Sequence, residues 1–176
     1  MFGNTISNSQ ISALVKKNEL VIAPFDTERL TTAHYCLSPL RLFDEDAREI
    51  ICDFLNEPVA TLKPGVYYKL EVDTLIVVPK GIVGVFTTSS TLIEMGISLH
   101  AGRIDWPYGQ HGEPIRFGLK NETTREKALQ RDTRVAHVEF RDLRGLELLP
   151  FDVSPSDLRA WLVRKWRAAD DGPSYE

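Results

Sequence analysis

A mainly β fold, a sandwich or barrel of short strands, is the class that the amino-acid sequence predicts. Three apolar segments, residues 66–70, 74–78 and 82–86, follow one another closely, and turns rich in proline and glycine (63–65 and 79–81) separate them. Short strands at this spacing are typical of sandwiches and barrels rather than of alternating strands and helices. With 176 residues, 43% hydrophobic and 26% charged, the chain is long enough for one domain with a substantial core.

Before these strands, the chain is expected to begin with a helix and two extended segments. Residues 7–20 form the helix, because Ser7 or Ser9 can cap it and apolar residues share one face. Residues 21–24 are extended, since the proline at the end forbids a helical continuation. Residues 30–37 form a strand.

A second helix is predicted over residues 43–55. Asp44 is a good cap, acidic residues fill the first turn, and a buried stripe recurs at helical spacing, formed by Ile50, Ile51, Phe54 and Leu55. A short helical turn is expected over residues 92–95. The remaining strands are predicted at residues 96–102, 115–119, 134–140 and 146–149.

The C-terminal part differs from the rest, so we divide the chain into a β domain over residues 1–153 and a tail over residues 154–176. Ser154 and Pro155 begin an amphipathic helix. Its apolar residues at helical spacing are Leu158, Trp161, Leu162 and Trp166. The tryptophans are expected to pack on the domain or on a neighbouring subunit.

Composition excludes several classes of function. The formal net charge of −4 argues against a protein that coats nucleic acid. The only feature that favours nucleic-acid binding is the basic C-terminal helix. No apolar run approaches the roughly 20 residues of a membrane span, and no signal-peptide pattern opens the sequence. We therefore expect a cytoplasmic protein without membrane contact. The histidines and the two cysteines, Cys36 and Cys52, have no metal-type spacing.

The most distinctive segment for chemistry is residues 96–108, GISLHAGRIDWPY. An alternating strand carries Arg103 and Asp105 toward a turn that contains Tyr108. A carboxylate held at a sheet edge beside an aromatic ring can activate a water molecule. The alternative is that Asp105 only hydrogen-bonds its turn and that Tyr108 covers the core.

Two further groups are candidates for substrate binding. The first is the hydroxyl-rich run Ser89, Ser90 and Thr91, between a strand and a helical turn, where hydroxyl and N–H groups can receive phosphate oxygens. The second is the pair Arg134 and His137 on a late strand. Both groups also suit ordinary turn and surface positions.

Five stretches, in order along residues 6–150, together resemble the dCTP deaminase/dUTPase superfamily. The opening through TTAHYCL is similar to the N-terminal helix and first motif of the deaminase branch, and LKPGVYYKLEVDTLIVVPKGIVGVF is similar to the hairpins that follow. SSTLIEMGI stands at the phosphate motif, GISLHAGRIDWPY resembles the Asp-and-Tyr motif of the dUTPase branch, and DTRVAHVEF resembles a later strand.

The resemblance implies a distorted β-barrel or jelly roll of the dUTPase-like type, with N-terminal, internal and C-terminal helices. It also implies a homotrimer with active sites at subunit interfaces, which deaminates dCTP or hydrolyses dUTP to dUMP and pyrophosphate, with Mg²⁺ on the nucleotide. Asp105 would then position or deprotonate the attacking water or hold the sugar 3′-hydroxyl. Tyr108 would pack on the deoxyribose, and Ser90 would contact the phosphates of the deoxynucleoside triphosphate.

The sequence departs from the superfamily pattern at several positions. Cys36 replaces a motif aspartate, Ser89 stands where a phosphate-binding arginine is expected, and Gly118 falls where the deaminase has its catalytic glutamate. Glu94 replaces another arginine, His137 replaces a glutamine, and the glycine-rich C-terminal motif is missing. Two functions follow as hypotheses: a pyrimidine deoxynucleotide hydrolase, or a catalytically impaired trimer that binds a nucleotide or a protein as sensor, inhibitor or structural subunit.

Overall fold

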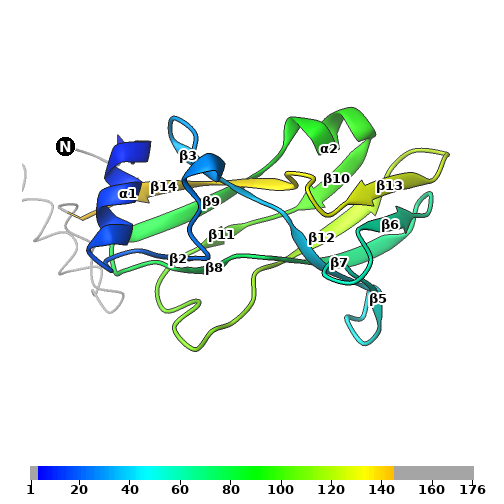
Figure 1. Cartoon of the computed structure of the whole chain (residues 1–176), viewed down its shortest axis with the longest axis horizontal. Coiled ribbons are helices and arrows are strands. Elements are labelled where there is room, and N and C mark those ends of the chain that lie inside the picture. Colours follow the sequence, from blue (N-terminus) through cyan, green and yellow to red (C-terminus); the bar gives the residue numbers. More distant parts are fainter. Residues whose placement is uncertain (1–3, 145–176) are drawn as a thin grey trace, which may run out of the picture. The chain divides into compact units, whose positions relative to one another are not determined.

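The computed structural model describes residues 4–144, and the mainly β class is confirmed (Figure 1). The first sheet has the order β1-β14-β9-β11, and β3 also pairs with β14. Its strands are β1 (Asn4–Thr5), β3 (His34–Leu37), β9 (Ile82–Thr88), β11 (Arg103–Ile104) and β14 (Ala136–Asp142). Every pairing in this sheet is antiparallel.

The second sheet also has five antiparallel strands, in the order β10-β12-β7-β4-β5. These are β4 (Pro39–Phe43), β5 (Ile50–Asp53), β7 (Tyr67–Val72), β10 (Ile97–His100) and β12 (Arg116–Asn121). Two short antiparallel pairs complete the described strands: β2 (Val21–Ala23) with β8 (Leu75–Val77), and β6 (Val59–Leu62) with β13 (Lys127–Gln130). Within residues 4–144 the strands thus form separate sheets rather than one closed barrel.

The hydrophobic core lies between the two large sheets. Phe86 of β9 meets Phe117 of β12 edge to face, with the ring centroids 5.0 Å apart. Alternate residues of β14, from Ala136 to Phe140, are fully buried, as expected for strands with one face on a core. Burial of these apolar side chains is the main force that joins the sheets.

Two helices lie at different ends of β9 (Figure 1). Helix α1 (Asn8–Lys16) begins at Ser7, whose hydroxyl accepts a hydrogen bond from the Gln10 N–H in a capping box, so the predicted helix and cap are confirmed. Helix α2 (Ser90–Met95) confirms the predicted helical turn. A short 3₁₀ helix, η1 (Thr27–Arg29), precedes β3. No helix in the described part of the chain is long and apolar enough to cross a membrane.

The prediction of a helix over residues 43–55 is wrong, because this segment is the β4–β5 hairpin. Asp44 does not cap a helix: its Oδ1 accepts hydrogen bonds from the N–H groups of Arg48 (2.7 Å) and Glu49 (3.1 Å), which closes a turn. Ala47 adopts a left-handed conformation with φ of 58°, which a helix cannot contain. Ile50 and Ile51, expected to be buried, are 51% and 43% exposed.

A second correction concerns residues 96–102, which do not form one strand leading directly to Asp105. Strand β10 ends at His100 in the second sheet, and the chain crosses to the first sheet, where β11 pairs with β9. The expected strands at residues 66–70, 74–78, 82–86, 115–119 and 134–140 are confirmed within two or three residues as β7, β8, β9, β12 and β14. The predicted strand at 146–149 and helix and tail at 154–176 lie outside the described residues.

Candidate active site

Asp105 follows β11 directly and stands on an exposed turn. The buried Ile104 side chain and the β9 pairing hold the strand, so the position of the next residue is well defined. The Tyr108 N–H donates to the Asp105 carbonyl at 2.9 Å, which closes the turn. Among residues 4–144, the Asp105 carboxylate has no hydrogen-bond or ion-pair partner and is exposed. This carboxylate is therefore accessible to a ligand or a water molecule.

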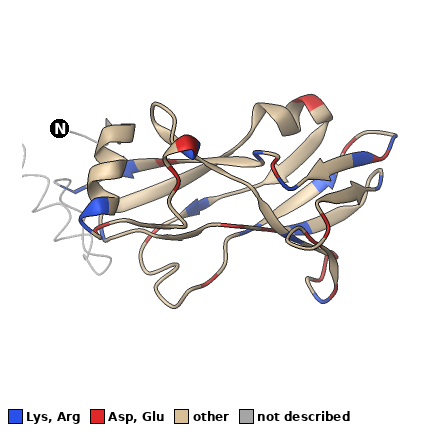
Figure 2. Cartoon of the chain, in the orientation of Figure 1, with Lys and Arg blue, Asp and Glu red and all other residues tan. Residues whose placement is uncertain are grey.

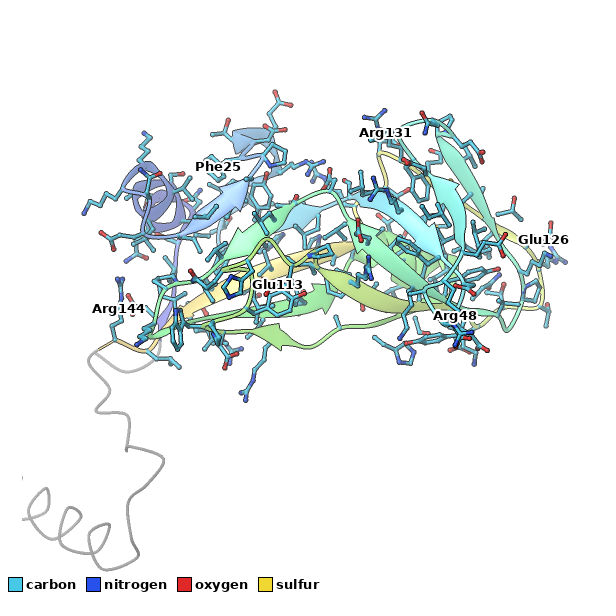
Figure 3. The ribbon with its side chains drawn as sticks, turned by 90° about the horizontal axis from the view of Figure 1, so that it is seen from below. Phe25, Arg48, Glu113, Glu126, Arg131 and Arg144 are labelled. Carbon is cyan, nitrogen blue, oxygen red and sulfur yellow. The ribbon has the colours of Figure 1, made fainter. Side chains whose placement is uncertain are left out.

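Tyr108 lines a small cavity next to this turn. The cavity has a volume of about 140 Å³, and Arg103, Ile104, Phe117 and Arg116 also contribute to its wall. The Tyr108 hydroxyl donates to the Pro114 carbonyl at 2.7 Å, and this bond fixes the ring. Burial, followed by the nearby carboxylate of Glu113 (labelled in Figure 3), raises the pKa of the Tyr108 phenol. The phenol is therefore a hydrogen-bond donor at neutral pH.

The hydroxyl-rich run Ser89, Ser90 and Thr91 is divided by the start of helix α2. Ser89 is buried and caps the helix, because its hydroxyl accepts a hydrogen bond from the Leu92 N–H at 3.3 Å. Ser90 and Thr91 occupy the first helical turn and are exposed. In this subunit, the hydroxyls that a ligand can reach are thus those of Ser90 and Thr91.

Arg134 and His137 lie near this helix. The Ser89 N–H donates to the Val135 carbonyl at 3.2 Å, and His137 pairs with Thr87 across the β14–β9 register. Arg134 is exposed and lines the larger cavity, of about 640 Å³, together with Arg131 (labelled in Figure 3). The structure therefore brings the predicted phosphate-binding candidates to one region.

His137 itself faces other side chains rather than open solvent. Its ring stacks on His34, with the centroids 4.2 Å apart, and the two rings adjoin Cys36. Burial lowers the pKa of His137, and the neighbouring His34 and Arg134 act in the same direction. The imidazole is therefore neutral at pH 7 and cannot supply a fixed positive charge to a phosphate.

The Asp105 turn and the Ser90 region lie far apart within one subunit. Ile104 opposes Gly84 near the start of β9, whereas Ser90 follows the other end of that strand. Ser90 comes six positions after Gly84, which along an extended strand corresponds to about 20 Å. One nucleotide bound at Asp105 therefore cannot reach Ser90 of the same chain without spanning most of β9.

A side chain at position 118 would collide with the Tyr67 ring in its present position. A Cβ atom on Gly118 would lie 1.8 Å from the Tyr67 hydroxyl oxygen and 2.5 Å from its Cζ atom. Tyr67 is fixed by an edge-to-face contact with His100, with the ring centroids 5.5 Å apart. The Tyr67 ring thus occupies the space into which an acidic side chain at position 118 would project.

Basic side chains are not concentrated around Ser90 in the described part of the chain. Basic and acidic positions are interspersed along the described ribbon (Figure 2), and Glu94 on α2 is exposed. The larger cavity mixes the two signs as well, since an ion pair between Arg29 and Asp73 (Nη1–Oδ1, 3.0 Å) forms part of its lining. Only Arg131 and Arg134 add basic side chains beyond this pair among the described lining residues.

The fold is similar to that of solved dCTP deaminase and dUTPase structures. No protein-family model matches the sequence, and no curated protein matches it. Solved structures do resemble this protein, but the sequence identity is so low that the likeness concerns the fold alone.

A 2′-deoxycytidine 5′-triphosphate deaminase from Agrobacterium tumefaciens has a TM-score of 0.64 and 14% identity, over 81% of this chain and 49% of that chain. The present chain thus corresponds to about half the length of that deaminase. A mutant dUTPase from phage phi11 of S. aureus, described with a structural Mg(II) ion, has a TM-score of 0.51 and 14% identity, over 77% of this chain and 98% of that chain. The dUTPase of Staphylococcus bacteriophage 80alpha has a TM-score of 0.50 and 14% identity, over 78% of this chain and 98% of that chain.

Two features of this region could not be predicted from the sequence. The 640 Å³ cavity is built from five separate segments, which no local pattern can bring together. The cluster of His34, Cys36 and His137 needs the register between β3 and β14. The only local signal was the His-x-Cys spacing, which places two side chains on one face of a strand.

Proposed function

We propose that this protein is a pyrimidine deoxynucleotide hydrolase that converts dUTP to dUMP and pyrophosphate, and that it acts as a homotrimer. The observation that carries the proposal is the exposed Asp105 carboxylate on the turn that also carries Tyr108, directly after Arg103 and Ile104, and these three neighbours line the small cavity. A carboxylate held by a rigid strand and free of other partners suits a general base. The superfamily fold makes a deoxynucleotide the first substrate class to test.

In the proposed reaction, Asp105 accepts a proton from a water molecule whose oxygen attacks the α-phosphorus. The bond from phosphorus to the bridging oxygen breaks, and pyrophosphate leaves. Tyr108 would pack against the deoxyribose, with its ring held by the bond to the Pro114 carbonyl. The exposed hydroxyls of Ser90 and Thr91, with Arg134, are the groups proposed to contact the phosphates.

The separation of about 20 Å along β9 supports the trimer, because a nucleotide can meet both groups only if they come from different subunits. In this arrangement Asp105, Arg103 and Tyr108 of one subunit face Ser90, Thr91 and Arg134 of another. Ser89 would act indirectly, by capping the helix that carries the two exposed hydroxyls.

Deamination of dCTP is not part of the proposal. Replacement of an amino group by water requires an acid–base group that moves a proton to the leaving ammonia. At Gly118, where the resemblance places that group, the Tyr67 ring fills the side-chain space.

The donors near Ser90 do not fit Mg²⁺. This ion prefers carboxylate, carbonyl and water oxygens, whereas the group at that place consists of Cys36, His34 and His137. We therefore assign no Mg²⁺ ligand to these side chains and route no step through the ion. Any Mg²⁺ would come with the triphosphate.

A catalytically impaired trimer that binds a nucleotide or a protein partner is the second candidate. The observation in its favour is the exposed Glu94 on α2, a carboxylate close to the proposed phosphate contacts. Two negative groups at short range repel each other, which weakens triphosphate binding. This candidate keeps the fold and the trimer but lacks turnover.

The test is an assay of the purified protein with Mg²⁺ and either dUTP or dCTP. We expect pyrophosphate from dUTP, no ammonia from dCTP, and a loss of at least about 100-fold in kcat for Asp105→Asn. Asp46→Asn is the matched control, because Asp46 is an exposed aspartate on the β4–β5 turn. Nucleotide binding without turnover, or full activity of Asp105→Asn, would overturn the proposal.

A further inference from the structure

Three metal-binding side chains gather on the outer face of the first sheet. His34 and Cys36 are alternate residues of β3, and His137 of β14 lies directly opposite Cys36 in the antiparallel register. One nitrogen or sulfur atom from each residue lies within 4.8 Å of the corresponding atoms of the other two. The arrangement is built from two strands about 100 residues apart in sequence, so it depends on tertiary structure.

Cys36 is buried without belonging to the hydrophobic core. Its side chain is 1% exposed, yet its strand neighbours Tyr35 and Leu37 are the residues that point into the core cluster. Cys36 therefore lies on the opposite face, beneath the two half-buried imidazoles. The Cys36 sulfur in this position is shielded from solvent and lies within 4.8 Å of one ring nitrogen of each histidine.

We propose that His34, Cys36 and His137 form a binding site for a zinc ion. Two imidazole nitrogens and one thiolate are a ligand set that zinc accepts, with a fourth position for water or another ligand. Soft sulfur and borderline nitrogen donors disfavour Mg²⁺ and Ca²⁺. On binding, the Cys36 thiol loses its proton to solvent, the sulfur and the two neutral imidazoles each donate an electron pair to Zn²⁺, and no redox change occurs.

The site needs only a small rearrangement to close on the ion. Zinc bonds of roughly 2.0–2.3 Å place tetrahedral ligand atoms about 3.3–3.7 Å apart. The present limit of 4.8 Å is therefore about 1 Å too wide. Both imidazoles are half-buried and stacked at an interplanar angle of 23°, so rotation of the rings can bring one nitrogen of each toward the sulfur.

The charges around the site are balanced. Zn²⁺ with one thiolate carries a net charge of +1, and Glu139, opposite His34 in the register, supplies a negative charge. Arg134 and Arg29 lie close enough to act on the Cys36 thiol and oppose a cation. Arg29 is already paired with Asp73, which leaves Arg134 as the main unfavourable neighbour among the described residues.

The experiment is a titration of the reduced, untagged full-length chain with Co²⁺, a coloured substitute for Zn²⁺. We expect one Co²⁺ per chain, a near-ultraviolet thiolate-to-cobalt band that shows sulfur ligation, and displacement of the band by Zn²⁺. Cys36→Ser should abolish the band and weaken Zn²⁺ binding by at least about 100-fold. Cys52→Ser is the matched control, because Cys52 is also a free and buried cysteine.

A second pair of variants keeps the test valid if Cys36→Ser does not fold. His34→Gln replaces a half-buried ring and should weaken Zn²⁺ binding while the fold survives, and His100→Gln, at an exposed histidine of β10, should have no effect. Absence of the thiolate band in the reduced wild-type protein would overturn the proposal. An equal loss in Cys52→Ser or His100→Gln would do the same. The readout uses no nucleotide, so it is independent of the proposed hydrolysis.

Discussion

The two ends of strand β9 carry different chemistry. Near Gly84, strand β11 presents Asp105 as an exposed carboxylate beside a small cavity. Near Thr87, the same sheet gathers imidazole, thiol, hydroxyl and guanidinium groups, including His137 and Ser90. The Asp105 end offers an exposed carboxylate next to a turn whose cavity is lined by Arg103 and Arg116, whereas the Ser90 end offers exposed hydroxyls, stacked imidazoles and Arg134.

Under the proposed function, a nucleotide would have to contact groups from both ends. A strand of this length holds its ends about 20 Å apart, and bending it would break the pairings with β11 and β14. Association of identical chains can place one end of one subunit against the other end of its neighbour, and a closed ring repeats this contact. The predictions below alter one end at a time.

The largest effect is expected at Gly84, beneath the Asp105 turn. A Cβ atom there would lie 2.9 Å from Cγ1 of Ile104 and 3.2 Å from Cγ2 of Val138. Gly84→Ala should displace β11, lower the free energy of unfolding by about 1–3 kcal/mol and reduce dUTP turnover. Gly102→Ala, where no atom lies within 4 Å, should change stability by less than about 0.5 kcal/mol. Urea unfolding checks both, and equal losses would contradict the packing argument.

The next effect concerns the hydroxyl end. Ser90→Glu should raise KM for dUTP about tenfold, roughly 1.4 kcal/mol, because a carboxylate would face the phosphates. The helix itself should tolerate the change, since acidic residues are favourable in a first turn. Ser9→Glu, also an exposed serine in the first turn of a helix, is the control and should leave KM unchanged. An unchanged KM for Ser90→Glu would remove Ser90 from the site.

The smallest effect is a pH dependence near the Asp105 end of the sheet. Hydrogen bonds from Arg144 (labelled in Figure 3) hold the pKa of Asp142 below its ordinary value of 3.8, with Nη2–Oδ2 at 2.7 Å. The unfolded chain therefore binds the proton first, so the stabilisation is present above about pH 4 and is lost as the pH falls through the folded pKa.

Asp142→Asn should remove this pH dependence and cost less than about 1 kcal/mol at pH 7, because both side chains are partly exposed. Urea midpoints at pH 7 and pH 3 measure the effect. Asp46→Asn provides the comparison, since its contact to Arg48 is longer, at 3.8 Å, and its side chain is 60% exposed. If the two variants respond alike to pH, the Arg144 contact does not stabilise the fold.

Local patterns in the sequence predicted most of the sheet but not its hairpin at residues 43–55. Turns with proline and glycine, at Pro64-Gly65 and before Ile82, marked the ends of predicted strands, and the structure has strands at these places. Asp44 was misleading because an aspartate followed by acidic residues suits a helix cap and a side-chain-closed turn equally well. The left-handed Ala47, which decides between them, has no signature in the sequence.

The candidate site could be predicted in parts but not as an arrangement. Asp105 and Tyr108 share one turn, so four residues of sequence were enough to associate them. The distance between Asp105 and Ser90 depends on the register of β11 against β9, which no spacing in the sequence reveals. The filling of the Gly118 position by Tyr67 likewise depends on the pairing of β12 with β7.

Mixed trimers of two defective variants test the central claim most directly. Asp105→Asn and Ser90→Glu chains, each with a different tag, are co-expressed and the mixed assemblies are purified. If each site takes Asp105 from one subunit and Ser90 from another, every purified mixed trimer has one site in three, about one third of the sites, with both residues intact. We predict that dUTP hydrolysis at low substrate rises well above the level of either variant alone, toward this fraction. Activity no higher than the average of the two variants would contradict a site shared between subunits.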